Sequence, residues 1–119
     1  MSCLGKGSYA EVILVSRRKD NKLFALKCVD KRFVMNAGKE HIFVTEREML
    51  KYMNHPNIIS LYATFQNDSK LFYLLEYVEL GELSHYYLSK GKLDLQEAKS
   101  IIYQLVNVLS YLHSLGIAH

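Results

Sequence analysis

Lys27 is the residue whose setting most strongly suggests chemistry, because it stands inside a strongly apolar run at residues 23–29. A buried ammonium group needs a partner, although a strand lysine that reaches solvent is the ordinary alternative. Glu46 follows nineteen residues later, beside the apolar stripe of a predicted helix. An ion pair between Lys27 and Glu46 would hold the ammonium group where it can neutralise phosphate groups.

A glycine-rich segment near the start of the chain is the second candidate for phosphate contact. Gly5, Gly7 and Ala10 form the pattern Gly-x-Gly-x-x-Ala. Alone the pattern is weak, because closely spaced glycines are common in turns, and a dinucleotide-binding unit needs a strand before the motif and a helix after it. A predicted strand that starts at Val12 follows instead. This order favours a hairpin whose backbone amides can approach phosphate oxygens closely.

Length, composition and charge exclude several classes of protein. The 119 residues suit one domain or a piece of one. A content of 50% hydrophobic and 23% charged residues indicates a folded protein rather than a disordered one. Fifteen Lys and Arg against twelve Asp and Glu give a net charge of +3, which is too small and too scattered to predict a nucleic-acid partner.

Cysteine and histidine usage predicts neither a disulfide scaffold nor a metal site. Cys3 and Cys28 lack any paired spacing, which fits a reducing compartment. The histidines His55, His85 and His113 are isolated, so we interpret them as surface or packing groups. No basic-apolar leader opens the chain, and we therefore expect no secretory signal and a cytoplasmic location.

The elements that must position Lys27 and Glu46 follow from hydropathy patterns. Strands are predicted at residues 12–16, 23–29, 58–65 and 71–78, and a helix at residues 39–53. Residues 71–75 are nearly all apolar, as in a strand buried on both faces. After Gly81 the pattern is helical throughout. Strands with one helix, followed by helices alone, predict an α+β fold in two unequal pieces.

The last predicted helix has a clear start and end. Asp94 and Glu97 have the spacing of a capping box, and Gly116 supplies a stop after about Leu115. Residues 101–119 carry no Lys, Arg, Asp or Glu, which by length alone would suit a membrane span. Polar residues at helical spacing interrupt this run, namely Gln104, Asn107, Ser110, His113 and Ser114. We therefore predict no transmembrane segment but a helix with one strongly apolar face.

Taken in order, these features resemble a eukaryotic protein kinase domain. The resemblance rests on the glycine-rich hairpin, Ala25-x-Lys27, Glu46, the turn at residues 55–57 and the strand ending in residues 76–78. Residues 111–119 are similar to the approach to the catalytic loop, with His119 as the histidine of its His-Arg-Asp motif. The resemblance implies a small lobe at residues 1–77, with an antiparallel sheet and one main helix. Residues 78–119 would then be the hinge and the first helices of a truncated large lobe.

The resemblance implies a Ser/Thr protein kinase that transfers the γ-phosphate of ATP to protein substrates. Lys27 would orient the phosphates, and Glu46 would position Lys27. The catalytic Asp and the Mg²⁺ ligands of the family would lie beyond the chain end, so we expect these 119 residues to be inactive alone. The runner-up hypothesis is a pseudokinase or a truncated binding module, which docks tails without catalysis.

The resemblance also assigns the nucleotide contacts. They are Leu4, Gly5, Lys6, Gly7, Ser8, Tyr9, Ala10, Val12, Ala25, Lys27, Leu75, Glu76, Tyr77, Val78 and Glu82. The apolar members would form the adenine slot, with plain core packing as the alternative. Residues 76–78 would offer backbone groups to the base, and Glu82 would lie near the ribose. Ala10 departs from the family pattern, which has a third glycine there, and this change could stiffen the loop.

Within the family, the chain is most similar to the phosphoinositide-dependent kinases, in the group related to the cyclic-nucleotide-dependent kinases. Residues 30–32, 64–71 and 81–83 carry this likeness. It implies activation loops of related kinases as substrates, and membrane recruitment through regions outside this chain. It also implies a groove that receives the hydrophobic-motif tail of such kinases. The matching positions are Lys31, Val34, Phe43, Arg47, Thr64, Gln66 and Leu71. The alternatives are ordinary packing and helix-surface residues, or another kinase of the same group that has no docking groove.

Overall fold

The computed structural model describes residues 2–8 and 10–118, and the chain in it divides into two compact parts. We call Met1–Met53 together with Ile59–Val78 the first unit. The second unit consists of Asn54–Ile58 and Glu79–His119. The grouping of Asn54–Ile58 with the second unit was not anticipated from the sequence. Tyr9 and His119, which the sequence analysis singled out, lie outside the described residues.

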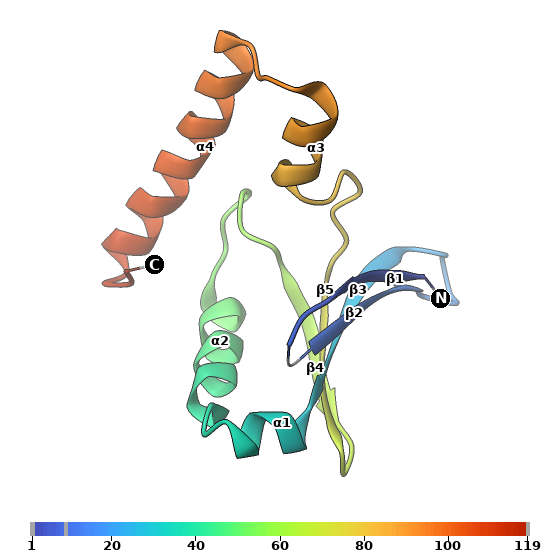
Figure 1. The fold of residues 1–119 in the computed structure, drawn as a ribbon. Coiled ribbons are helices and arrows are strands. Elements are labelled where there is room, and N and C mark those ends of the chain that lie inside the picture. The colour runs from blue at the N-terminus through green and yellow to red at the C-terminus, as the bar shows by residue number, and fades with distance from the viewer. Residues whose placement is uncertain (1, 9, 119) are drawn as a thin grey trace. The chain divides into compact units, whose positions relative to one another are not determined.

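The first unit is built on a five-stranded antiparallel sheet with the strand order β1-β2-β3-β5-β4 (Figure 1). Its strands are β1 (Cys3–Lys6), β2 (Ala10–Ser16), β3 (Leu23–Asp30), β4 (Leu61–Gln66) and β5 (Lys70–Glu76). The α+β class is confirmed, and every predicted strand is present. The largest error is at β4, which begins at Leu61 instead of residue 58.

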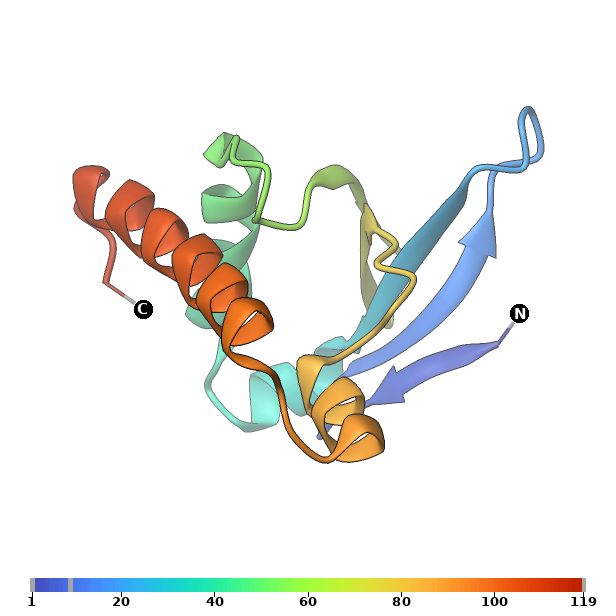
Figure 2. The ribbon, with the colours of Figure 1, turned by 90° about the horizontal axis from the view of Figure 1, so that it is seen from above.

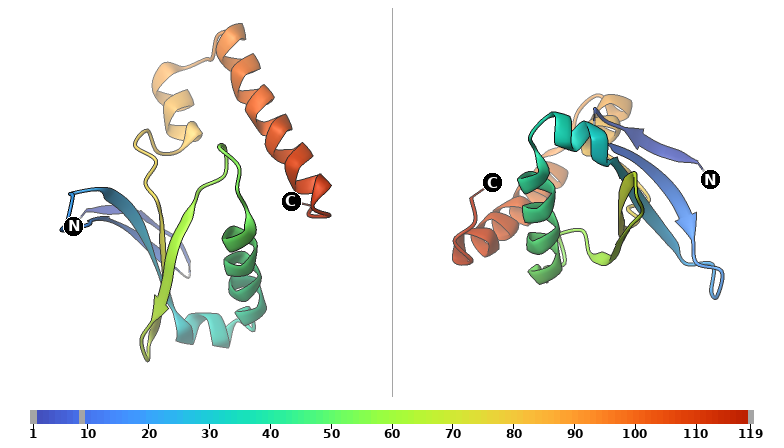
Figure 3. Two further views of the ribbon diagram at one scale, coloured as in Figure 1. Left: turned by 180° about the vertical axis from the view of Figure 1, so that it is seen from behind. Right: turned by 90° about the horizontal axis from the view of Figure 1, so that it is seen from below.

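The core of the first unit lies between the sheet and α2 (Glu40–Tyr52), which covers one sheet face (Figure 3). Val29, Val34, Phe43 and Tyr73 form this core, and Val29 has no exposed surface. The prediction that residues 71–75 are buried on both faces was wrong, since all of them except Tyr73 are only half-buried. For Phe72 and Leu74 the physical reason is that they lie on the sheet face opposite Val29 and Tyr73, whereas α2 covers the face of Val29 and Tyr73.

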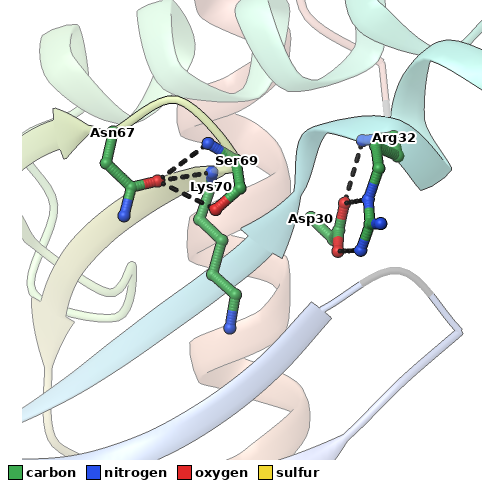
Figure 4. A network of polar contacts seen from close by, with 5 residues as sticks. All are labelled: Asp30, Arg32, Asn67, Ser69 and Lys70. Carbon is green, nitrogen blue, oxygen red and sulfur yellow. Dashed lines mark hydrogen bonds and ion pairs between the residues drawn. The ribbon is translucent and has the colours of Figure 1, made fainter.

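A short helix, α1 (Lys31–Asn36), joins β3 to the loop before α2 and was not predicted. The carboxylate of Asp30 caps it by accepting a hydrogen bond from the backbone N–H of Arg32 at 2.9 Å. The Arg32 guanidinium also pairs with this carboxylate at 3.0 Å (Figure 4). The side-chain contact, followed by the backbone one, lowers the pKa of Asp30 below its ordinary value. Six residues are too few for a helical period, but an Asp at the cap was a readable signal.

Local polar contacts shape the β2–β3 and β4–β5 turns of the sheet. In the β4–β5 turn, the side-chain oxygen of Asn67 accepts hydrogen bonds from the backbone N–H groups of Ser69 at 3.0 Å and Lys70 at 2.7 Å (Figure 4). In the β2–β3 turn, Arg17 pairs with Asp20, and Asn21 adopts a φ of 57°. Asn is among the few residues that tolerate this left-handed conformation.

The second unit contains α3 (Leu83–Lys90) and α4 (Leu95–Ser114), joined by a short connection (Figure 2). The predicted capping box is confirmed, because Asp94 and Glu97 each accept a hydrogen bond from the other's backbone N–H. The helix ends at Ser114, and Gly116 takes a φ of 72°, as a glycine stop signal requires.

Polar contacts tie the segment Asn54–Ile58 to α4. The Tyr111 hydroxyl accepts a hydrogen bond from the Asn54 backbone N–H at 3.1 Å, and the Asn57 amide donates to Gln104 at 2.8 Å. The His55 ring lies 5.1 Å from the Tyr111 ring. The apolar face of α4 is largely exposed, with Ile102, Tyr103, Leu105 and Val106 each more than half accessible. No helix of the described residues has the length and apolar character to cross a membrane.

Candidate functional site

The predicted ion pair between Lys27 and Glu46 is present in the first unit. The Lys27 Nζ atom lies 2.8 Å from Oε1 and 3.1 Å from Oε2 of Glu46, so it contacts both carboxylate oxygens. Lys27 comes from β3 and Glu46 from α2. The side chains are 22% and 35% exposed, which leaves the ammonium group reachable for an anionic ligand while the pair stays partly shielded.

Two aromatic rings support the Lys27 ammonium group. The rings of Phe43 and Tyr73 each have their centroid 5.8 Å from Nζ, within the range of cation–π attraction. Tyr73 is the residue opposite Lys27 in the β3–β5 ladder, and Phe43 comes from α2. The ammonium group is therefore held by a carboxylate on one side and by π-systems on others, which fixes its position.

The apolar residues predicted for the adenine slot lie close together on the sheet. Val12 is paired with Lys27, and Ala25 is paired with Leu75. Directly paired residues share one sheet face, and so do residues two apart in a strand, such as Ala25 and Lys27. The side chains of Val12, Ala25 and Leu75 therefore lie on the same face as that of Lys27. Leu4 belongs to β1, at the point where the β1–β2 register shifts, and it is 43% exposed.

The glycine-rich segment forms a hairpin, as predicted. β1 pairs with β2, and the Gly7 backbone N–H donates to the Ala10 carbonyl at 2.8 Å. A Cβ at Gly5 would meet no heavy atom within 4 Å, and one at Gly7 only the Ala10 carbonyl oxygen at 3.7 Å. The hairpin therefore does not need glycine for its own packing. Lys6, Gly7, Ser8 and Ala10 also line a cavity of about 150 Å³ that reaches Cys28, on the sheet face opposite Lys27.

The segment at residues 76–78 is anchored at Glu76, the last residue of β5. The Glu76 backbone N–H donates to the Ser60 carbonyl at 2.9 Å, and its carboxylate accepts from the Ser60 N–H at 3.2 Å. Tyr77 and Val78 follow, and Val78 is 47% exposed. Glu82 belongs to the second unit, where it is the N-cap residue of α3 and accepts a hydrogen bond from the Ser84 hydroxyl.

A larger cavity, of about 430 Å³, lies between α1, α2, β4 and β5 of the first unit. We call it the α2 groove. All seven predicted groove residues line it, namely Lys31, Val34, Phe43, Arg47, Thr64, Gln66 and Leu71. The sequence analysis missed further lining residues, namely Met35, Glu40, Val44, Phe65, Phe72 and Tyr73. Glu40 and Val44 could have been found from the helical spacing of α2, and Tyr73 from its alternation with Leu71 in β5. Strand alternation gives no such signal for Phe65 and Phe72, because each is a direct neighbour in sequence of predicted groove residues.

The two cations of the α2 groove have local partners in the free chain. Lys31 Nζ donates to the Asn67 carbonyl at 2.8 Å. The Arg47 guanidinium pairs with Glu48 at 2.6 Å, and both side chains are at least 40% exposed. Exposed ion pairs contribute only about 0–1 kcal/mol, so Arg47 can exchange this partner for a stronger anion at little cost.

The chain offers no clustered metal ligands within its described part. No group of three His, Cys, Asp or Glu side chains gathers there as a metal site requires. The two cysteines are free thiols, Cys3 exposed and Cys28 half-buried. Burial is the main cause that raises the pKa of the Cys28 thiol above its ordinary value, which disfavours a reactive thiolate.

Comparison with known proteins relates the whole chain to kinases. Residues 1–119 match the family model described as the protein kinase domain. A 3-phosphoinositide-dependent protein kinase 1 of Arabidopsis thaliana is 38% identical over 115 residues, covering 97% of this chain and 23% of that protein. The serine/threonine-protein kinase cds1 of Schizosaccharomyces pombe is 33% identical, covering 98% and 26%. The human calcium/calmodulin-dependent protein kinase type 1B is 36% identical, covering 98% and 33%. The chain thus spans a third or less of each of these relatives.

Proposed function

This chain belongs to the protein kinase domain family, and from that membership we propose that it is the ATP-binding part of a Ser/Thr protein kinase. Its homologues are Ser/Thr protein kinases. The longer protein would transfer the γ-phosphate of ATP to Ser or Thr of protein substrates. Similarity to a 3-phosphoinositide-dependent protein kinase supports activation loops of related kinases as those substrates.

The Lys27–Glu46 pair is the observation that carries this proposal. An ammonium group that contacts both oxygens of one carboxylate, yet keeps 22% of its side chain exposed, is fixed in place and still open to phosphate oxygens. Glu46 compensates the lysine charge before the nucleotide binds, so the attraction within the pair offsets the cost of partly desolvating Lys27 in its strand. In kinases such a pair orients the phosphates for transfer.

The rest of the nucleotide site fits a purine and a phosphate chain. Val12, Ala25 and Leu75 share a sheet face with Lys27, so an adenine ring packed on them would extend its phosphates toward the ammonium group. The open space at Gly5 leaves room for phosphate oxygens beside the hairpin amides. When bound, ATP with Mg²⁺ supplies the phosphoryl group and the neutralising metal charge.

Substitution of Lys27 tests the catalytic assignment. In the full-length protein, Lys27→Met should lower phosphate transfer to a protein substrate at least about 100-fold, as loss of one charge-stabilising donor does in other enzymes. Met keeps the apolar stem of the side chain, so the thermal unfolding midpoint should change little. Lys19→Met is the matched control, because Lys19 is exposed in the β2–β3 turn.

Two outcomes would redirect the proposal. Undiminished phosphate transfer by the Lys27→Met variant would overturn the role of Lys27. A full-length wild-type protein that binds hydrophobic-motif tails but transfers no phosphate would favour a pseudokinase or a binding module.

The α2 groove supports a second proposed function, docking of a phosphorylated hydrophobic-motif tail from a related kinase. Apolar side chains from α1, α2 and β5 line the groove, including Val34, Phe43 and Leu71, and they suit the aromatic residues of such a tail. Lys31 and Arg47 supply cations for a phosphate group. Glu40 also lines the groove and would repel an anion nearby, so the phosphate should bind at the Arg47 end.

Loss of Arg47 should weaken tail binding selectively. Arg47→Ala should raise the dissociation constant of a phosphorylated hydrophobic-motif peptide about tenfold, the effect of losing roughly 1.4 kcal/mol of charge-assisted hydrogen bonding. Fluorescence titration measures this, with the unphosphorylated peptide as a second ligand that should respond less. Lys51→Ala is the control, because Lys51 is exposed on the same helix but outside the groove. Equal losses in both variants would contradict a specific groove.

The proposed organisation and location follow from the same reasoning. Residues 1–77 would be the small lobe of the kinase, and residues 78–119 the hinge and start of the large lobe. Two free thiols support a reducing compartment, and we place the protein in the cytoplasm.

A further inference from the structure

Tyr73 makes a buried contact that the proposed function does not use. Its side chain is only 3% exposed, and its hydroxyl donates a hydrogen bond to the Phe43 backbone carbonyl at 3.1 Å. This bond joins β5 to the N-terminal part of α2, across thirty residues of sequence. Burial raises the pKa of the Tyr73 hydroxyl, with the nearby Glu46 charge as a lesser cause, so the group remains a protonated donor.

The bond lies next to the Lys27–Glu46 pair at both of its ends. On the sheet, Tyr73 is directly opposite Lys27 in the β3–β5 ladder. On the helix, Phe43 precedes Glu46 by three residues, a spacing that places the two side chains on neighbouring positions of one helix face. The sheet and α2 are therefore joined here by two parallel polar links, the ion pair and the tyrosine bond.

We propose that Tyr73 is a positioning residue that fixes α2 against the sheet so that Glu46 stays within reach of Lys27. This inference rests on the proposed role of Lys27 in binding ATP. A long Lys and a Glu can pair over many helix positions, whereas a buried Tyr ring with one hydroxyl has few rotamers. The tyrosine bond therefore restricts the helix more tightly than the ion pair does.

The hydroxyl can be removed without disturbing the packing around it. Tyr73→Phe keeps the ring in the core and beneath the Lys27 ammonium group. The Phe43 carbonyl lies inside α2 and keeps its helical hydrogen-bond partner, so no buried acceptor is left without a bond. The substitution thus isolates the link between β5 and α2. The ordinary alternative is a core tyrosine that only satisfies its own hydroxyl group.

A double-mutant cycle in the full-length protein separates these two readings. The variants are Tyr73→Phe, Glu46→Gln and the two combined, and the measurements are the ATP dissociation constant by calorimetry and the unfolding midpoint. Loss of a hydrogen bond worth about 1 kcal/mol predicts a roughly fivefold weaker ATP affinity for Tyr73→Phe in the wild-type background. In the Glu46→Gln background the same change should alter affinity less than about twofold, since there is no ion pair left to position.

Tyr62→Phe is the matched control for loss of a tyrosine hydroxyl. Tyr62 lies on β4, and its hydroxyl accepts a hydrogen bond from Lys22 at 3.3 Å, away from α2. This variant should keep wild-type ATP affinity. Equal affinity losses for Tyr73→Phe in both backgrounds would show a purely structural role and overturn the proposal.

A crystal structure of the full-length Tyr73→Phe variant distinguishes failure of this inference from failure of the proposed function. If Tyr73 positions the helix, the separation of Lys27 Nζ from the Glu46 carboxylate should exceed about 4 Å, the limit for an ion pair. An unchanged pair would overturn the positioning role whatever ATP does. A lengthened pair together with unaltered ATP affinity in Glu46→Gln would instead overturn the ATP-binding role of the pair and leave the positioning of α2 standing.

Discussion

Each of the two units is stabilised internally in its own way, and one ion pair from each unit shows the difference. In the first unit, Lys27 and Glu46 are nineteen residues apart and join a strand to a helix above a shared core. In the second unit, Lys90 and Glu97 are seven residues apart and join the end of α3 to the first turn of α4. The first pair depends on long-range packing, and the second on a local turn.

Burial follows the same division. The buried core cluster of the first unit draws on β3, α1, α2 and β5. Among the described residues of the second unit, Leu112 alone is classed as buried, and α4 leaves a broad apolar face exposed. A unit with its own core can hold an ammonium group in a fixed place, which catalysis requires. The described residues of the second unit form no comparable core: α4 begins at a capping box, α3 has no side-chain cap, and the exposed apolar face of α4 suits burial against another surface.

Removal of core volume should therefore affect the first unit most. Val29→Ala deletes two methyl groups from a fully buried side chain and should lower the local free energy of unfolding by about 2 kcal/mol. The protection factors of the β3 amides should therefore fall about 30-fold. Hydrogen exchange of the 119-residue chain measures this effect.

Val106→Ala makes the same chemical change in the second unit and serves as the comparison. Val106 is 56% exposed on α4, and Ala favours helix. The local free energy of unfolding of α4, obtained from amide exchange, should therefore change by less than about 0.5 kcal/mol. Similar losses from both substitutions would break the contrast between the two units.

The sequence predicted those parts of the fold whose signals are local or strongly periodic. The capping box of Asp94 and Glu97 and the long helices were visible because each signal lies within a few turns. The short helix α1 was missed because six residues carry no period. The exposure of β5 was misjudged, since a run of apolar residues does not tell which sheet face a helix covers.

The candidate site was predicted to a similar degree. The Lys27–Glu46 pair could be found because a lysine in an apolar strand demands a partner, and the next helix offered one. The tyrosine bond to Phe43 could not, because an unremarkable Tyr in a strand gives no hint that its hydroxyl reaches a helix carbonyl. Such contacts depend on the distance between α2 and the sheet, which only the folded chain sets.

The smallest expected effect concerns the local network of the second unit under acid. The Glu97 carboxylate accepts hydrogen bonds from the Lys90 ammonium group, the Asp94 backbone N–H and the Tyr86 hydroxyl. The Lys90 contact is the main cause that lowers the pKa of Glu97 from 4.5 to about 2. Because the folded pKa is depressed, the stabilisation is complete above about pH 4.5 and is lost as the pH falls toward about 2.

Carbon NMR of the Glu97 carboxyl group should show this directly, with a titration midpoint near 2. Over the same pH interval, amide protection in the first turn of α4 should decline modestly, because an exposed network is screened by solvent. Glu97→Gln is the matched control, since Gln can keep the capping box but carries no charge, and its α4 protection should change less than that of the wild type over this interval. A midpoint at the ordinary value of 4.5 would mean that the network does not persist in solution. The first turn of α4 would then depend on its backbone hydrogen bonds and the Asp94 cap, which would widen the contrast between the two units.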